Sequence, residues 1–291
     1  MGVNFVTSVK NCARLLADIT VPLVVVGACV ALYRLGIMYL LENMSPLGDV
    51  QLTVLRRLGV MASLLIGYLV VARYYERRPV TELAFKPLAI SISGVLGLLL
   101  IGVTILCLYA FGYYQFHLVR GYSVALPIFG AILVGVLVEE IIFRGVVFRL
   151  LEQHTGTIRA LLIQAPVFGA LHIFNEGASL MTVLSVTLLG AFWAGIYVYS
   201  RNLWVVIANH ATWNVTIFLS GAPLSGQKEW TRSSPFETSY EGPSWLTGGG
   251  FGPEDSIINI LVMACALGGL IYWGSRTGRF LKGSWADSES S

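Results

Sequence analysis

The chain has 291 residues, of which 56% are apolar and only 12% are charged. Its mean hydropathy is +0.73. Soluble globular domains carry roughly twice this share of charged residues, and disordered chains contain few apolar ones. The composition therefore excludes both classes and predicts a protein embedded in a lipid bilayer. The net charge of +3 is small, and no run of Lys and Arg interleaved with aromatic residues indicates a nucleic-acid partner.

A helix needs about 20 apolar residues to cross a membrane. The sequence offers eight apolar segments near that length, separated by clusters of charged residues, Pro and Gly. They predict an all-α, polytopic membrane protein with about eight transmembrane helices, forming a single integral-membrane domain over residues 1–291. The segments span about 20–41, 56–75, 88–113, 123–150, 159–174, 179–199, 203–221 and 257–274.

The parts of the chain outside the apolar segments are predicted to lie outside the membrane. The connection at about 222–256 is rich in Gly, Ser, Pro, Trp and Glu, which is typical of an exposed extramembrane loop. Residues 282–291 form a polar C-terminal tail, of which 286–291 are expected to be disordered. The cysteines form no CxxC pair and are predicted to be buried, inert thiols: Cys12, Cys29, Cys107 and Cys265.

The distribution of Lys and Arg predicts the orientation in the membrane. If both termini are cytoplasmic, 12 of these residues lie on the cytoplasmic side and 5 on the other side. Cytoplasmic connections collect positive charges, so both termini are predicted to be cytoplasmic, in a prokaryotic cell membrane. The cytoplasmic set is Lys10, Arg14, Arg73, Arg77, Arg78, Lys86, Arg149, Arg159, Arg201, Arg276, Arg279 and Lys282; the other set is Arg56, Arg57, Arg120, Lys228 and Arg232.

The fourth apolar segment carries charged residues at bilayer depth, where each unpaired charge is costly. In the stretch VEEIIFRG, Glu139 and Glu140 are adjacent and Arg144 follows four residues after Glu140. On a helix, Glu140 and Arg144 share one face and can form an ion pair, whereas Glu139 points about 100° away. Glu139 is therefore predicted to face a cavity and to act as a proton acceptor or relay.

Two later segments add polar side chains. The fifth contributes His172, and the seventh contributes His210 and Asn214, four residues apart on one helix face. Both His210 and Asn214 can donate hydrogen bonds to an oxyanion. Counted at about 1.5 Å per residue from the cytoplasmic ends, these groups and Glu139 lie roughly 10 to 20 Å deep. They are predicted to share one functional cavity, placed between the midplane and the cytoplasmic interface.

Several known ways of hydrolysing a peptide inside a bilayer lack their signature in this sequence. There is no HExxH helix, no Asp deep in an apolar segment, and no GxSG motif around Ser220. The remaining chemistry is a water molecule activated by Glu and His, with His and Asn around the oxyanion.

The motifs Glu139-Glu140-x3-Arg144, Phe168-x3-His172 and His210-x3-Asn214 resemble the CAAX protease and bacteriocin-processing family. These are glutamic-type intramembrane proteases that include the Ras-converting CAAX endopeptidases. The resemblance spans about a quarter of the chain. It implies that Glu139 is the general base, that His172 helps to activate water, that Glu140 pairs with Arg144, and that His210 and Asn214 form the oxyanion hole.

The resemblance implies a hydrolase whose substrate is a membrane-associated or lipidated protein or peptide. No metal is expected, because Arg144 neutralises the charge that would attract one, and zinc bound by two His and two Glu is the alternative. A non-catalytic membrane adaptor or bacteriocin-immunity protein is a second interpretation. A proton-coupled transporter is a third, although transporters often carry polar groups in both halves of the chain.

Overall fold

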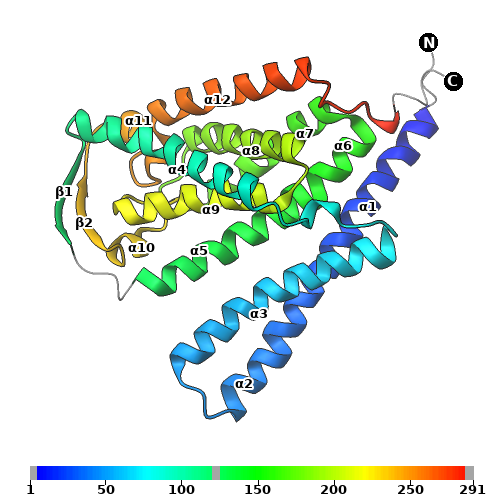
Figure 1. The fold of residues 1–291 in the computed structure, drawn as a ribbon, viewed down its shortest axis with the longest axis horizontal. Helices are drawn as coiled ribbons and strands as arrows, with labels where there is room; N and C mark the ends of the chain where they lie inside the picture. The colour runs from blue at the N-terminus through cyan, green and yellow to red at the C-terminus, as the bar shows by residue number, and fades with distance from the viewer. Residues whose placement is uncertain (1–4, 120–124, 286–291) are drawn as a thin grey trace.

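The computed structural model describes residues 5–119 and 125–285 (Figure 1). All eight predicted apolar segments are helical in this part of the chain, and the prediction of an all-α polytopic membrane fold is confirmed. The main helices are α1 (Phe5–Ala31), α2 (Met38–Met44), α3 (Asp49–Val70), α4 (Pro87–Ala110), α5 (Ala125–Glu140), α6 (Arg149–Thr155), α7 (Thr157–Leu171), α8 (Leu180–Ser200), α9 (Leu203–Ser220) and α12 (Ile257–Arg276).

Six helical stretches among the described residues are long and apolar enough to cross a membrane. They comprise 10–44, 49–75, 87–110, 157–174, 180–200 and 257–276. The other two predicted segments are α5 with its continuation, and α9. These two helices carry most of the polar side chains that the sequence analysis singled out, including Glu139, Glu140, His210 and Asn214.

Helix α8 forms the centre of the bundle, with α7, α9 and α12 around it, while α1 and α3 form a peripheral hairpin (Figure 1). Helix α9 packs closely on α4. The Thr212 hydroxyl donates a 2.7 Å hydrogen bond to the Gly94 carbonyl, and a Cβ atom at Gly97 would collide with the Asn209 carbonyl. Small residues allow two membrane helices to approach in this way, and the contact fixes the position of α9.

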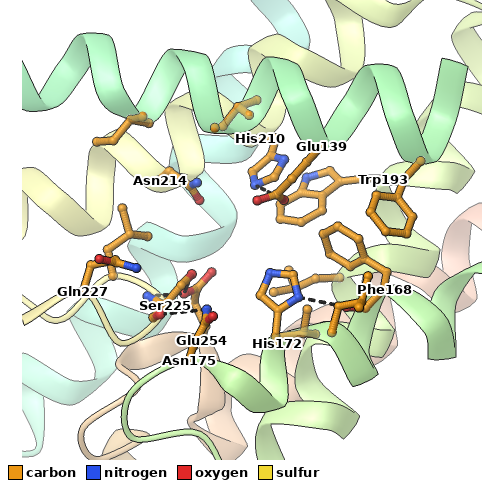
Figure 2. A pocket seen from close by; sticks show the side chains of 18 of the residues that line it. Glu139, Phe168, His172, Asn175, Trp193, His210, Asn214, Ser225, Gln227 and Glu254 are labelled. Atoms are coloured by element: carbon orange, nitrogen blue, oxygen red, sulfur yellow. Dashed lines mark hydrogen bonds and ion pairs between the residues drawn. The ribbon is translucent and has the colours of Figure 1, made fainter. Parts of the chain in front are cut away.

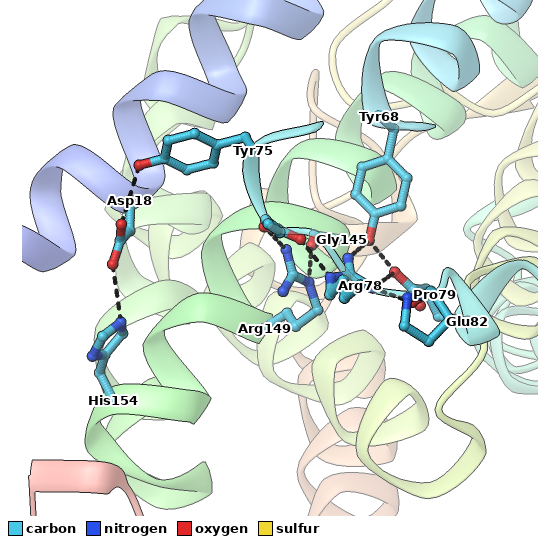
Figure 3. A network of polar contacts seen from close by, with 10 residues as sticks. Asp18, Tyr68, Tyr75, Arg78, Pro79, Glu82, Gly145, Arg149 and His154 are labelled. Atoms are coloured by element: carbon cyan, nitrogen blue, oxygen red, sulfur yellow. Dashed lines mark hydrogen bonds and ion pairs between the residues drawn. The ribbon is translucent and has the colours of Figure 1, made fainter. Parts of the chain in front are cut away.

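The helix that carries the two glutamates is anchored at its C-terminal end. It runs from α5 through the π-helix η4 (Ile141–Phe148) into α6. A π-turn displaces carbonyl groups from their α-helical partners. In η4 the Gly145 carbonyl accepts hydrogen bonds from Arg149 Nε (2.8 Å) and from the Tyr68 hydroxyl (3.2 Å), as Figure 3 shows. Arg149 also pairs with Glu76, so that the helix is tied to the connection before α4.

The connection 222–256 differs from the predicted exposed loop. It contains α10 (Lys228–Arg232), β2 (Phe236–Tyr240), α11 (Ser244–Thr247) and the short 3₁₀ helix η6 (Pro253–Asp255). Strand β2 pairs antiparallel with β1 (Tyr114–Val119), a small sheet that the sequence analysis did not predict. Phe251 and Asp255 are buried. Gly252 allows the connection to fold closely on itself, because its φ is +119° and a Cβ atom there would collide with the Pro223 carbonyl.

The connections between helices gather at two opposite ends of the bundle. One set comprises 75–87, 155–157, 200–203 and 276–285, and we call it the basic end. Its members contact one another, because Asn202 Nδ2 donates to the Ala84 carbonyl (2.6 Å) and the Thr157 amide donates to the Leu281 carbonyl (3.1 Å). The other set comprises 171–180 and 220–257, and we call it the pocket end, where Asn175 Nδ2 donates to the Ser225 carbonyl (3.1 Å).

One further prediction needs correction. The four cysteines are free, but Cys12 and Cys265 are exposed and the other two are half-buried. The outer side of a membrane helix faces lipid, where a small apolar thiol is tolerated without burial. The chain around the start of the predicted tail contacts the basic end: the Leu281 amide, just before the tail, donates to Thr157 Oγ1 (2.8 Å), and Trp285 within it lies 6.0 Å from the ring of His154. Residues 286–291 lie outside the described residues.

Candidate active site

A cavity of about 370 Å³ opens between α5, α7, α8 and α9 (Figure 2). Four of the six predicted site residues line it: Glu139, His172, His210 and Asn214. Figure 2 shows Glu139, His210 and Asn214 along one wall, and His172 with Asn175 across the cavity from them. Three segments that are distant in sequence therefore contribute polar groups to one cavity, as the sequence analysis predicted.

The two adjacent glutamates have different surroundings. The Glu139 side chain is 34% exposed, into the cavity, whereas that of Glu140 is fully buried. Glu140 Oε1 accepts hydrogen bonds from Arg144 Nη1 (3.1 Å) and from His210 Nδ1 (2.7 Å). The predicted pairing of Glu140 with Arg144 is confirmed. Glu139 has no Lys or Arg partner within ion-pair distance among the described residues, and its nearest charged-type contact is His210 Nε2 at 3.9 Å.

Arg144 lies behind the cavity wall. Its side chain is fully buried, and Nη2 donates a 2.9 Å hydrogen bond to the Gly190 carbonyl on α8. The guanidinium also lies 4.7 Å from the centre of the Phe168 ring and 5.6 Å from that of Trp193. These contacts join α7, α8 and the helix of the glutamates. Arg144 therefore holds the site together without facing its interior.

His210 is held in one orientation by two contacts. Its ring stacks on Trp193 with 3.6 Å between ring centres and an angle of 20°, and its Nδ1 contacts Glu140. An ionised carboxylate only accepts hydrogen bonds, so Nδ1 carries the proton of this contact. The other nitrogen, Nε2, is directed toward Glu139. Nε2 can accept a proton when His210 is neutral, and it can donate a hydrogen bond only when both nitrogens are protonated.

The opposite wall begins where α7 ends. His172 directly follows Leu171, the last residue of α7, and its Nδ1 contacts the Phe168 carbonyl at 2.8 Å. That contact leaves Nε2 as the ring nitrogen free for substrate or water. On the first wall, Asn214 Oδ1 has no hydrogen-bond partner among the described residues. Both side chains therefore offer unused polar atoms to a ligand in the cavity.

The sequence analysis missed several residues of the cavity. Glu254 lines it, although it lies in the connection that was predicted to be exposed. Its Oε2 accepts from the Ser225 amide (2.9 Å) and hydroxyl (2.6 Å), and its Oε1 accepts from Trp213 Nε1 (3.3 Å). Burial raises the pKa of Glu254 to about 7. The only sequence signal was a Glu-Asp pair placed directly before the last apolar segment.

The cavity also reaches the pocket end. It is lined by Asn175, Ser225, Gln227, Trp230 and Glu254, which all belong to that end. The predicted depth of the site in the membrane, counted from the opposite ends of the helices, stays a prediction. Helix α7 is short and stops at Leu171, which places His172 at the pocket end and not near the basic end.

The donor set does not favour a metal ion in this arrangement. Among the residues that the structure describes, no three His, Cys, Asp or Glu side chains lie close enough together to hold one. Glu140 and Nδ1 of His210 bind each other, and Arg144 contributes a positive charge beside them. The expectation that the site works without a metal remains a prediction, and it has its own test below.

The fold and the cavity define a polytopic membrane protein with a polar, enclosed site inside the helix bundle. Residues 121–216 match the family described as Type II CAAX prenyl endopeptidase Rce1-like. This segment contains all six predicted site residues. The match confirms the resemblance to the CAAX protease and bacteriocin-processing family over these residues.

A curated relative from Bacillus subtilis carries the name "Putative membrane peptidase YdiL". It is 33% identical over 97 residues, which are 33% of this chain and 38% of the relative. The similarity therefore spans little more than a third of that relative's length. No solved structure matches the chain.

Proposed function

We propose that the protein is an intramembrane endopeptidase of the glutamic type, in which Glu139 and His172 activate the attacking water. One observation carries this proposal. Of two adjacent glutamates on one helix, Glu140 is fully buried and paired, while Glu139 faces the cavity with no Lys or Arg partner among the described residues. The family match over residues 121–216 and the name of the relative support a membrane protease.

The arrangement assigns a task to each side chain. Water bound between Glu139 and His172 loses a proton to Glu139 and attacks the carbonyl carbon of the peptide. Asn214 donates a hydrogen bond to the negative oxygen that forms, and His210 adds a second from Nε2 when it is doubly protonated. Glu139 then returns the proton to the leaving amine, so that the enzyme ends in its starting state. Glu140 and Arg144 hold His210 and the helices in place.

The substrate is a membrane-associated protein or peptide, because the cavity lies inside the helix bundle. Apolar side chains of Val136, Phe143, Leu189 and Trp193 line the cavity beside the polar ones. They suit a peptide segment with apolar residues. Nothing in this lining requires a prenyl group on the substrate.

The test compares cells that produce the wild type, Glu139→Gln and a control variant. Gln cannot accept a proton, and loss of general-base catalysis costs about 100- to 10,000-fold in rate. The control is Glu176→Gln, which removes an exposed carboxylate paired with Lys228 outside the cavity. We expect new N-termini of membrane proteins in cells with the wild type and the control, detected by enrichment of N-terminal peptides and mass spectrometry.

These N-termini should be absent with Glu139→Gln, although the variant reaches the membrane in equal amounts. Equal cleavage by the wild type and Glu139→Gln would show that Glu139 is not the base. A complete lack of cleavage products, together with an unchanged cellular effect of Glu139→Gln, would favour a non-catalytic adaptor.

A further inference from the structure

Among the described residues, the exposed part of the cavity lining lies at one end of the bundle. Two of its lining side chains are exposed: Leu171, at 52%, and Gln227. Leu171 ends α7 and Gln227 follows α9, so both belong to the pocket end. We therefore place the mouth of the cavity at these two residues.

The other side of the cavity is closed by buried side chains. Phe168, Trp193 and Arg144 are each at most 2% exposed, and they pack against one another behind His210. Beyond them, ion pairs join the segments of the basic end. Arg149 pairs with Glu76, and Arg78 pairs with Glu82 at 2.8 Å (Figure 3). Buried side chains and ion pairs thus lie between the cavity and the connections of the basic end.

The charges of the two ends differ strongly. The fold confirms that ten Lys and Arg residues lie on or directly beside the connections of the basic end: Arg73, Arg77, Arg78, Lys86, Arg149, Arg159, Arg201, Arg276, Arg279 and Lys282. The N-terminal half of α1 lies at the same end, because Asp18 contacts His154 of α6 at 3.4 Å. At the pocket end Lys228 pairs with Glu176, and no comparable excess of cations is present among the described residues. Such an excess marks the cytoplasmic end of a membrane protein.

Together these observations indicate the face of the membrane toward which the cavity opens. We propose that the cavity is entered from the extracytoplasmic face of the membrane, and that its substrates present their cleavage segment there. The substrate class is membrane-anchored or exported proteins with an accessible segment at the outer surface of the membrane. Substrates anchored on the cytoplasmic surface, such as cytoplasmic lipidated proteins, would meet the basic end, which contributes no exposed residue to the described cavity lining. The statement about substrates rests on the proposed function, whereas the side of access does not.

The side of access can be tested without any substrate. In a variant with all four cysteines replaced by Ser, Gln227→Cys places one thiol at the cavity mouth, and Thr277→Cys places one at the basic end as the matched control. A membrane-impermeant maleimide should label Gln227→Cys in spheroplasts and Thr277→Cys only in inverted vesicles. Glu229→Cys, exposed on α10, repeats the test if the first variant is not produced. Labelling with the opposite sidedness would overturn the proposal.

The substrate class is tested with a pair of membrane-anchored reporter libraries. Both carry the same randomised segment next to a single transmembrane helix, on the extracytoplasmic side in one library and on the cytoplasmic side in the other. We expect cleavage by the wild type, and not by Glu139→Gln, in the first library only. Cleavage confined to the cytoplasmic library overturns the inference while supporting the protease. Absence of cleavage in both libraries contradicts the proposed function and its substrate class, while the labelling result still decides the side of access.

Discussion

The buried carboxylates at the two ends of the molecule have different partners. At the basic end each one is paired with arginine: Glu76 with Arg78 and Arg149, Glu82 with Arg78, and Glu152 with Arg201. At the pocket end, Glu254 accepts hydrogen bonds from Ser225 and Trp213, and Asp255 accepts them from Thr182 and Ser185. Glu139, whose side chain is 34% exposed into the cavity, has only the 3.9 Å contact with His210.

This difference separates structural from reactive carboxylates. A carboxylate that is buried with an arginine stays ionised and ties segments of the chain together. A buried carboxylate with only neutral donors is less well stabilised in its charged form. Burial accordingly raises the pKa of Glu254 to about 7 and that of Asp255 to about 6. The pocket end therefore holds carboxylates that can exchange protons near neutral pH.

The largest effect on stability is expected at the basic end. Glu76→Gln removes the negative charge between Arg78 and Arg149, and both Glu76 and Arg149 have side chains that are less than a tenth exposed. Loss of one partner of a buried ion pair costs about 3–5 kcal/mol. We expect a decrease of this size in the free energy of unfolding, measured by denaturant titration in mixed micelles. The exposed pair offers the control, because Glu176→Gln should cost less than about 1 kcal/mol. If Glu76→Gln and Glu176→Gln lowered the free energy of unfolding equally, the paired carboxylates of the basic end would not have the structural role assigned to them.

The next effect concerns catalysis and not stability. Asn214→Ala removes an amide that lines the cavity and whose oxygen has no protein partner among the described residues. Loss of one oxyanion donor typically costs about 100- to 1000-fold in kcat. We expect this loss with little change in KM, measured on a cleaved reporter. Thr216→Ala, on the same helix but outside the cavity lining, should keep full activity. A change in KM alone would mean that Asn214 binds the ground state of the substrate.

Much of the site could be predicted from local sequence, because its key relations are helical. The spacing of Glu140 and Arg144 is enough to place them on one face, and the one-residue step is enough to turn Glu139 away from them. The same holds for His210 and Asn214, which both reach the cavity. These relations depend only on the helical period, and they persist although η4 is a π-helix.

The remaining features depend on long-range packing, for which the sequence has no local signal. The bond from His210 to Glu140 joins residues 70 positions apart, and the contact of Ser225 with Glu254 depends on how the connection 222–256 folds back on itself. Composition suggested an exposed loop, since Gly and Ser are frequent on surfaces, but here they permit close backbone packing.

The pocket end should also make stability depend on pH. The ordinary pKa of Glu254 is 4.5 and its pKa in the folded protein is about 7, so between these values the folded protein holds a proton that the unfolded chain has released. The free energy of unfolding must therefore fall as the pH rises through this window and level off above it. At about 1.4 kcal/mol per pKa unit, the decline is roughly 3 kcal/mol. Glu254→Gln should flatten the decline in thermal unfolding measured from pH 4.5 to 8. The same slope in both proteins would assign the dependence to other groups.

The smallest effect is expected from chelation. This experiment tests whether a bound metal ion balances the carboxylates of the pocket end. A metal ion could replace the absent arginines beside Glu139. It would need the lone pairs of His172 and His210, but Nδ1 of His210 donates to Glu140, Nδ1 of His172 contacts the Phe168 carbonyl, and the two rings stand on opposite walls of the cavity (Figure 2). Only the two Nε2 atoms and Glu139 remain, and they would have to move together across the cavity. We therefore expect a strong chelator to leave the cleavage rate unchanged and elemental analysis of the purified protein to find no stoichiometric zinc. Zinc that is bound in a 1:1 ratio, lost in His172→Ala and required to restore activity would show that the pocket-end carboxylate is balanced by a metal, so that both ends would pair their buried carboxylates with cations.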